Sequence, residues 1–236
     1  MPKSIAVFGA GPGLGQAVAR RYAQEGYEVL LVSRLRQPLD ALAQSLIAAG
    51  ASAHAISGDL SDTGTVPALA ERIRAAVGGL DAIYYAPTPE DGFVSAAGLT
   101  PQRAQSFMPL VFFSLIALVQ QFLPHMQGDD AILTAHGAST VYGLPNMSGP
   151  GPAQAAQRNY LQSLHPEVAD KGVYVGMLYT GAIIENSAFH TYIEQSKTAN
   201  PVTGRDWGPA VNPAHLAQML WNMHQAKGEA EAKYPV

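Results

Sequence analysis

The chain contains no cysteine among its 236 residues. It therefore has no disulfides, no thiolate metal ligands and no cysteine nucleophile, and we expect no metal site. Charged residues are also scarce, at 14%, and the net charge is -4 at pH 7 with no cluster of Lys or Arg. We expect no binding to nucleic acid or anionic membranes, because both depend on clustered positive charge.

Long hydrophobic runs are missing as well. The longest apolar stretch, Val111 to Val119, contains Ser114 and is far shorter than the roughly 20 residues that span a bilayer. An apolar strand pattern already begins at Ser4, which leaves no room for a secretory signal, so we expect a cytoplasmic protein. The low charge and the apolar helix patterns at Pro109–Leu123 and Ala153–Val168 predict a homodimer or homotetramer. The alternative is that these helices are simply deeply buried.

Short β-rich runs alternate with longer helical patterns along the chain. Such alternation predicts a single α/β domain over residues 1–236, with a doubly wound parallel sheet of about six to seven strands between helix layers. Near-continuous apolar runs such as Val29–Val32 are typical of strands buried on both faces. The expected strands lie near residues 4–8, 27–32, 52–56, 81–85, 131–135 and 173–179.

Residues from about 182 to 212 interrupt this alternation with scattered Gly, Pro and polar residues. A connection of this length inside a compact domain is usually functional, and a lid over a ligand is the common case. We therefore expect a lid-like substrate segment here. The alternative is a surface excursion that completes an oligomer contact.

A glycine-rich loop follows the first strand, Ser4 to Phe8, and precedes a helical pattern that starts at Gln16. Glycine lets the backbone turn sharply and approach a pyrophosphate, whose charge is favoured by the amides and the dipole at the next helix N-terminus. The loop therefore predicts dinucleotide binding in a Rossmann-type fold. Its candidate cofactor contacts are Gly9, Gly11, Pro12, Gly13, Leu14 and Gly15.

The end of the second strand distinguishes between the two nicotinamide dinucleotides. NAD enzymes of this fold usually carry an acidic residue there for the ribose 2′-hydroxyl. This chain has Ser33 and then Arg34, a planar cation suited to a 2′-phosphate, so the sequence predicts NADP(H). Arg36 is a second candidate, and either arginine could instead be a solvated surface charge.

The glycine spacing, G-x-x-x-G-x-G over Gly9, Gly13 and Gly15, resembles that of the short-chain dehydrogenase/reductase family. The resemblance runs over roughly residues 4 to 181. It implies that Asp59 and Leu60 contact the adenine and that Ala86 and Thr180 lie near the nicotinamide end. Asp59 has an alternative role as a turn residue before a helix that begins near Ser61.

The family's proton-transfer residues are absent from their expected positions. By the resemblance, the catalytic Tyr and Lys fall on Pro150 and Gln154, the Ser on Gly137, and the upstream Asn on Val111. Proline has no side-chain proton, and the amide of glutamine does not titrate near neutral pH. No Tyr-x-x-x-Lys sequence occurs anywhere in the chain.

Other polar residues follow the fifth strand and are candidates for proton transfer. They are His136, Ser139 and Tyr142, since open α/β sheets bind ligands at the carboxyl ends of their strands. A histidine there is expected to titrate in the useful range. Arg158 shares the helix face of Gln154 and could contact a phosphate or an anionic substrate. The alternative is that all of these are ordinary hydrogen-bonded residues.

These observations leave more than one function open. The first is an NADP(H)-dependent oxidoreductase that acts on a carbonyl, an alcohol or an activated double bond by a non-standard proton path. The second is a catalytically inactive NADP(H)-binding sensor or partner subunit. A third is a nonredox enzyme, such as a lyase or isomerase, that uses the same pocket.

Overall fold

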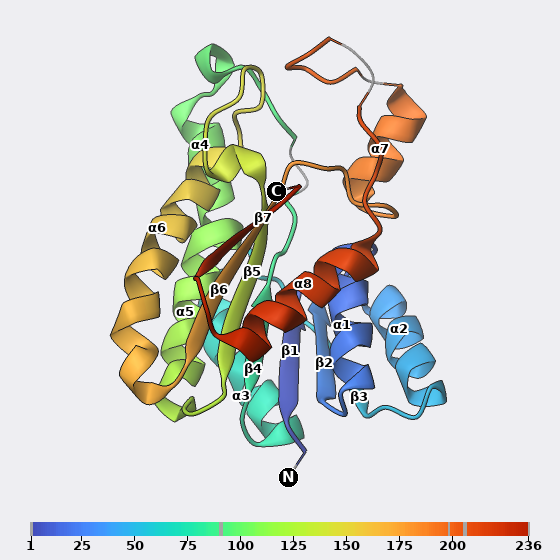
Figure 1. The fold of residues 1–236 in the computed structure, drawn as a ribbon, viewed down its shortest axis with the longest axis vertical. Coiled ribbons are helices and arrows are strands. Elements are labelled where there is room, and N and C mark those ends of the chain that lie inside the picture. Colours follow the sequence, from blue (N-terminus) through green and yellow to red (C-terminus); the bar gives the residue numbers. More distant parts are fainter. Residues whose placement is uncertain (1, 90–91, 198, 205–206, 236) are drawn as a thin grey trace.

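A computed structural model describes residues 2–89, 92–197, 199–204 and 207–235. Its centre is a sheet of seven parallel strands in the order β3-β2-β1-β4-β5-β6-β7 (Figure 1). The order reverses direction between β1 and β4, so the sheet is doubly wound as predicted. The strands are β1 (Ser4–Phe8), β2 (Glu28–Ser33), β3 (Ala53–Ser57), β4 (Ala82–Tyr85), β5 (Ala131–Gly137), β6 (Tyr174–Thr180) and β7 (Glu231–Tyr234).

Helices cover both faces of this sheet. On one face α1, α2 and α8 contribute to a buried apolar cluster, and on the other α3, α5 and α6 contribute to a second one (Figure 1). This arrangement confirms the predicted three-layer fold class. The helices are α1 (Leu14–Gln24), α2 (Arg36–Ala48), α3 (Val66–Val77), α4 (Pro101–Met108), α5 (Ser114–Phe122), α6 (Gly151–Val168), α7 (Ala188–Ser196) and α8 (Pro213–Ala226).

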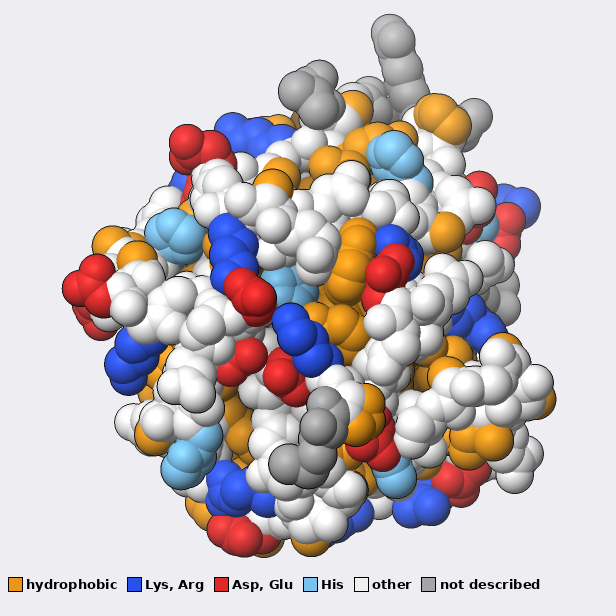
Figure 2. Space-filling model, turned by 60° about the horizontal axis from the view of Figure 1, so that its bottom comes forward, with side chains coloured by type: hydrophobic (Ala, Val, Ile, Leu, Met, Phe, Trp, Pro, Cys, Tyr) orange, Lys and Arg blue, Asp and Glu red, His pale blue; other side chains and the backbone are white. Residues whose placement is uncertain are grey.

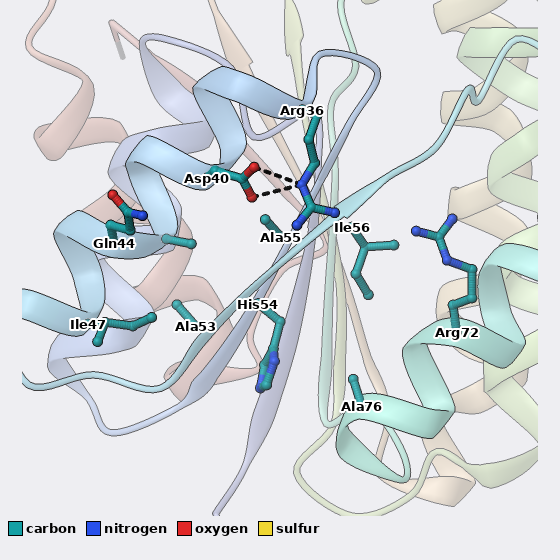
Figure 3. Close-up of a pocket in the computed structure, with 11 residues that line it drawn as sticks. Arg36, Asp40, Gln44, Ile47, Ala53, His54, Ala55, Ile56, Arg72 and Ala76 are labelled. Carbon is teal, nitrogen blue, oxygen red and sulfur yellow. Dashed lines mark hydrogen bonds and ion pairs between the residues drawn. The ribbon is translucent and has the colours of Figure 1, made fainter.

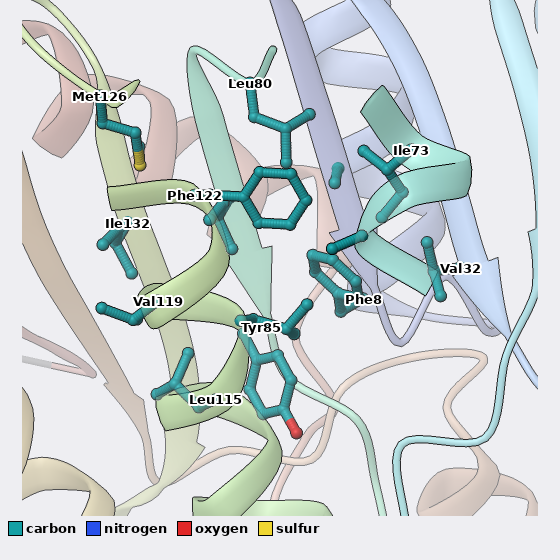
Figure 4. Packing of buried hydrophobic residues seen from close by; sticks show 14 of the residues in the cluster. Phe8, Val32, Ile73, Leu80, Tyr85, Leu115, Val119, Phe122, Met126 and Ile132 are labelled. Atoms are coloured by element: carbon teal, nitrogen blue, oxygen red, sulfur yellow. The ribbon is translucent and has the colours of Figure 1, made fainter. Parts of the chain in front are cut away.

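Apolar packing explains why the sequence predicts the strands. Every residue of β1 is buried, and Phe8 lies against Tyr85 with ring centroids 6.0 Å apart. Figure 4 shows these two rings with Leu115 and Phe122 of α5 on the same side of the sheet. The hydroxyl of Tyr85 is buried too, and it donates a hydrogen bond to the carbonyl of Leu110.

The helical run before β5 is interrupted where Pro109 stands. A proline inside a helix removes one backbone donor, and here α4 gives way to a π-helical turn, η3 (Pro109–Phe113), before α5 begins. The run Pro101–His125 is long and apolar enough to cross a membrane by length and composition, and its most apolar 18-residue window has a mean hydropathy of 1.8. This apolar helical run is longer than the Val111–Val119 stretch alone. Core helices of soluble proteins can have the same length and composition.

The edge formed by the amino ends of the strands has a mixed charge distribution. Figure 2 shows Lys and Arg side chains interspersed with Asp and Glu on this side of the molecule. One such pair joins Lys227 Nζ to Asp129 Oδ1 at 2.6 Å. Nearby, the buried Tyr22 hydroxyl and His224 Nδ1 lie 2.8 Å apart and fasten α8 to α1. The candidate site lies at the opposite edge.

Candidate functional site

Three glycines of the loop, Gly9, Gly13 and Gly15, stand where a side chain does not fit. Gly9 and Gly13 have positive φ angles of 91° and 86°. A Cβ atom on Gly9 would lie 2.8 Å from the carbonyl oxygen of Ala86, and one on Gly15 would lie 2.1 Å from that of Gly9. The backbones of β1, α1 and the segment after β4 therefore meet without side chains between them.

The same loop leaves space on its other side. A Cβ atom on Gly11 would meet nothing within 4 Å. Gly13 is the N-cap of α1, and no side chain of the described residues caps this helix. The uncapped start of α1 has its N–H groups and the positive end of the helix dipole available to an anion.

Hydrogen bonds hold the loop to the neighbouring strands. The amide of Gly9 donates to the carbonyl of Val32 on β2 at 3.0 Å. On the other side, the amide of Ala86 donates to the carbonyl of Phe8 at 3.1 Å. Ala86, expected near the nicotinamide end, thus lies beside the loop at the carboxyl end of β4.

Ser33 and Arg34 lie at the carboxyl end of β2, as the sequence predicts. Ser33 ends the strand and is half-buried, whereas Arg34 is exposed. Arg36 Nε contacts Asp40 Oδ1 at 2.8 Å one helical turn away, so Arg36 takes part in a surface ion pair.

Asp59 follows β3 and shapes its own turn. Its Oδ1 accepts hydrogen bonds from the amide of Ser61 at 2.8 Å and from the Ser61 hydroxyl at 2.7 Å. These bonds, with a smaller contribution from the charge of Arg34, lower the pKa of the Asp59 carboxyl. The turn role is therefore present, the neighbouring Leu60 is buried, and the adenine contact stays a prediction.

An open groove of about 580 Å³ lies along the outer edge of β3, between α2 and α3. Figure 3 shows the pair of Arg36 and Asp40 on one side, Arg72 on the other, and His54 on the strand. Its lining comes from α2, β3 and α3 and includes no residue of the glycine loop. We therefore do not identify this groove with the dinucleotide site.

Ser139 is near the position that the resemblance assigns to the catalytic serine. That position is Gly137, the last residue of β5. A Cβ atom on Gly137 would lie 3.5 Å from the Oγ atom of Ser139, because the chain turns back after the strand. The hydroxyl of Ser139 is thus beside the place where a side chain at residue 137 would begin.

The positions assigned to Tyr and Lys lie at the start of α6. Pro150 is the buried N-cap of this helix. Gln154, in the first turn, accepts a hydrogen bond at its Oε1 from the hydroxyl of Thr140 at 3.1 Å. Neither side chain offers a titratable proton, and Gln154 joins α6 to the turn that carries Ser139.

His136 does not have the environment expected of a general acid. Its side chain is only 6% exposed and stacks on Tyr179 of β6, with ring centroids 6.1 Å apart. Its Nε2 atom is buried without a hydrogen-bond partner among the described residues. Burial lowers its pKa to about 4, so the expectation that His136 titrates near neutral pH is wrong.

Arg158 is not free for a phosphate or an anionic substrate, which corrects the expectation from its helix face. Its Nε and Nη2 atoms each lie 2.8 Å from a carboxylate oxygen of Glu231 on β7. The Tyr179 hydroxyl accepts a further bond from Arg158 Nε at 3.2 Å. Tyr142, in contrast, is 55% exposed.

Thr180 ends β6 beside Gly137, its register partner on β5. Its hydroxyl accepts a hydrogen bond from the amide of Ala182 at 3.2 Å. The hydroxyl thus stabilises the turn into the 182–212 segment. Any contact of Thr180 with a nicotinamide stays a prediction.

The segment after β6 lies on the glycine loop, which the sequence did not reveal. A Cβ atom on Gly13 would lie 3.2 Å from the Cα of Ser187, the N-cap of α7. Farther along, Asn146 Nδ2 donates to the carbonyl of Pro201 at 3.3 Å. The only sequence signal for Ser187 is its capping pattern, since its hydroxyl accepts from the amide of His190.

Comparison with known proteins identifies the family. The family model for short chain dehydrogenases matches residues 3–196. The chain belongs to this family. It is 28% identical over 179 residues to the uncharacterized oxidoreductase YghA of Escherichia coli strain K12, covering 75% of this chain and 61% of that protein. It is 27% identical over 197 residues to the oxidoreductase asL5 of Sarocladium schorii, covering 82% and 77%.

Solved structures of short-chain dehydrogenases have the same fold. The NADPH-bound short chain oxidoreductase of Pseudomonas aeruginosa PAO1, described as containing an atypical catalytic center, has a TM-score of 0.83 at 22% identity, covering 99% of this chain and 96% of that one. The L-sorbose reductase of Gluconobacter frateurii, complexed with NADPH and L-sorbose, has a TM-score of 0.83 at 20% identity, covering 98% and 94%.

The close backbone packing predicts different effects for two glycines of the loop. Gly15→Ala places a Cβ on the carbonyl oxygen of Gly9, and we expect it to lower the free energy of unfolding by about 2–4 kcal/mol. Gly11→Ala enters open space and should change it by less than about 0.5 kcal/mol. Urea unfolding followed by circular dichroism measures both values, and equal effects would contradict this packing.

The buried His136 predicts a pH-dependent stability. Between pH 6.5 and about 4 the unfolded chain binds a proton at this residue that the folded chain does not. The free energy of unfolding therefore decreases as the pH is lowered across this window, by roughly 3 kcal/mol from His136 alone. We expect His136→Phe, which keeps a ring on Tyr179, to reduce this fall in urea titrations across that pH range, and an undiminished fall would contradict the role of His136.

Proposed function

We propose that the protein is an NADP(H)-dependent oxidoreductase that reduces a carbonyl or an activated double bond, or oxidises the corresponding alcohol, without the family's Tyr and Lys. The observation that carries the proposal is the glycine loop, whose backbone contacts and open outer side fit a dinucleotide. Membership of the short-chain dehydrogenase family supports it. The NADPH complexes of two structural neighbours support the choice of cofactor.

The residues present fit this cofactor. The amides at the start of α1 would bind the diphosphate, since Gly11 faces open space and no described side chain caps the helix. Arg34, exposed at the carboxyl end of β2, would bind the 2′-phosphate, and Asp59 and Leu60 lie at the end of the neighbouring strand. When bound, NADPH would supply the hydride.

Ser139 is the residue that we assign to the substrate oxygen. Its hydroxyl lies beside Gly137 at the carboxyl end of β5, and it can donate a hydrogen bond to a carbonyl oxygen there. After the carbonyl carbon gains a hydride, its oxygen takes the hydroxyl proton of Ser139, and Ser139 recovers a proton from water. His136 is neutral at physiological pH and buried, so it is a poor proton donor.

The absence of a strong general acid favours electrophilic substrates. General acid catalysis typically contributes about 10²–10⁴-fold to the rate. A carbonyl that is activated by a neighbouring electron-withdrawing group needs less of this help, because its alkoxide product is less basic. We therefore propose vicinal dicarbonyl compounds as the first substrates to test.

The helical run Pro101–His125 supports an oligomer. Only 39% of its most apolar window is buried within the chain, and Phe113 of η3 is 45% exposed. Phe112 and Tyr160 of α6 meet edge to face beside it, with ring centroids 6.1 Å apart. We propose that a second copy covers this face in a cytoplasmic homodimer or homotetramer that binds neither nucleic acid nor membranes.

The role of Arg34 can be tested by calorimetric titration with NADPH and NADH. We expect the wild type to bind NADPH more tightly, and Arg34→Ala to raise the NADPH dissociation constant by roughly 10–100-fold while leaving NADH binding unchanged. Arg36→Ala is the matched control, since Arg36 is paired with Asp40. Absence of binding by either nucleotide would contradict the proposed function, and binding without turnover of any carbonyl would favour a sensor.

The role of Ser139 is tested in steady-state reduction of diacetyl by NADPH. We expect Ser139→Ala to lower kcat by about 10²-fold, because a hydrogen bond to the developing alkoxide is lost. Ser139→Thr should recover part of this loss, and NADPH affinity should not change. An unchanged kcat in Ser139→Ala would exclude this residue from the reaction.

A further inference from the structure

Three segments that leave the carboxyl ends of β4, β5 and β6 are joined above the candidate site. The first two are joined through Val94 and Ser148, whose amides each donate to the other's carbonyl at 2.9 Å. The second reaches the segment after β6 through Asn146 and Pro201. The first also reaches the segment after β6 through a pair of aromatic rings, Phe93 and Phe189.

These rings form a cluster that we call the ring cluster, consisting of Phe93, Phe189 and Trp207. Phe189 of α7 is at its centre and meets Phe93 edge to face, with ring centroids 5.8 Å apart. It also meets Trp207 edge to face at 5.2 Å. All three side chains are partly buried rather than fully enclosed. Aromatic rings with exposed faces offer a large apolar contact area to a flat ligand.

The backbone segments that carry Phe93 and Phe189 are held in place by contacts with neighbouring parts of the protein. Next to Phe93, the carbonyl of Gly92 accepts a hydrogen bond from Arg103 Nη2 at 3.2 Å. A Cβ atom on Gly149 would lie 2.9 Å from the same carbonyl, so this wall is closely packed. On the other side, α7 starts at Ser187, which contacts Gly13 of the glycine loop. The segments that carry Phe93 and Phe189 are therefore anchored beside the start of α6 and beside the glycine loop.

We infer that the substrate carries a flat apolar group, an aryl ring, which binds against Phe93 and Phe189 while its carbonyl lies toward Ser139. The inference rests on the proposed function and names its substrate class. Rings cannot satisfy hydroxyl groups, and buried hydroxyls without partners cost free energy. A polyol such as L-sorbose, the ligand of one structural neighbour, does not suit this surface.

The first part of the test compares two substrates of the same chemical class in reduction by NADPH. Diacetyl and acetylbenzoyl are both vicinal diketones, and they differ by a methyl and a phenyl group. We expect kcat/KM to be at least roughly tenfold higher for acetylbenzoyl, mainly through a lower KM, and no turnover of L-sorbose. Equal values for the two diketones, or a preference for L-sorbose, would overturn the inference.

The second part uses variants of the ring cluster. Phe189→Ala and Phe93→Ala should each remove most of the preference for acetylbenzoyl, whereas Phe189→Leu should keep part of it. Gln195→Ala, at an exposed position of the same helix, should keep all of it. Circular dichroism and NADPH titration of each variant show whether fold and cofactor binding persist. Retention of the full preference in both alanine variants would overturn the inference.

Binding of acetophenone by calorimetry, with and without NADP⁺, separates this inference from the proposed function. Binding that Phe189→Ala weakens roughly tenfold supports the ring cluster even if no carbonyl is reduced, in which case the proposed function alone fails. NADPH-dependent reduction of diacetyl without acetophenone binding leaves the proposed function intact and overturns the aryl substrate.

Discussion

The contact of backbone against backbone at the glycine loop is the constraint on which the rest of the site depends. Gly15 lies on the carbonyl of Gly9, and Gly9 lies on that of Ala86, so the start of α1 is fixed relative to both β1 and β4. The N-terminus of α1 therefore lies at the carboxyl edge of the sheet, and a helix N-terminus favours anions. Ser187 in turn contacts Gly13, so the position of α7 follows from the same packing.

Around this edge, two polar side chains have partners within the protein and a third is buried. Arg158 is held by Glu231 and Tyr179, Gln154 accepts from Thr140, and burial keeps His136 neutral. These partners come from the structure itself and not from a ligand. Under the proposed function, a reaction there would depend less on proton transfer from a protein acid than on orientation, which alone can contribute several kcal/mol to hydride transfer. Such a site suits a substrate whose carbonyl is already electrophilic.

The sequence predicted the features that local pattern determines. The strand from Ser4 to Phe8, the glycine spacing and Arg34 after β2 were all placed correctly, because turn geometry and apolar runs are properties of neighbouring residues.

The features that the sequence did not predict depend on distant partners. β7 is short and polar, and its Glu231 is recognisable only beside Arg158, 73 residues earlier. The low pKa of His136 follows from its burial by residues distant in the sequence, such as Tyr179, and no local pattern reveals this burial. Counting placed the serine position at or beside Gly137 and left Ser139 as a candidate two residues away, and the turn after β5 brings the Ser139 hydroxyl beside Gly137.

The ring cluster and the uncharged site fit one physical scheme. Binding energy from a part of the substrate that does not react can be used to fix the part that does. An aryl group against Phe93 and Phe189 would hold the substrate by apolar contact, which needs no charged partner and leaves the ion pairs of α6 and β7 undisturbed. The orientation that a Tyr and a Lys help to provide in other members of the family would then come from Phe93 and Phe189. The absence of a Tyr-x-x-x-Lys sequence and the presence of the rings are, on this argument, parts of the same specialisation.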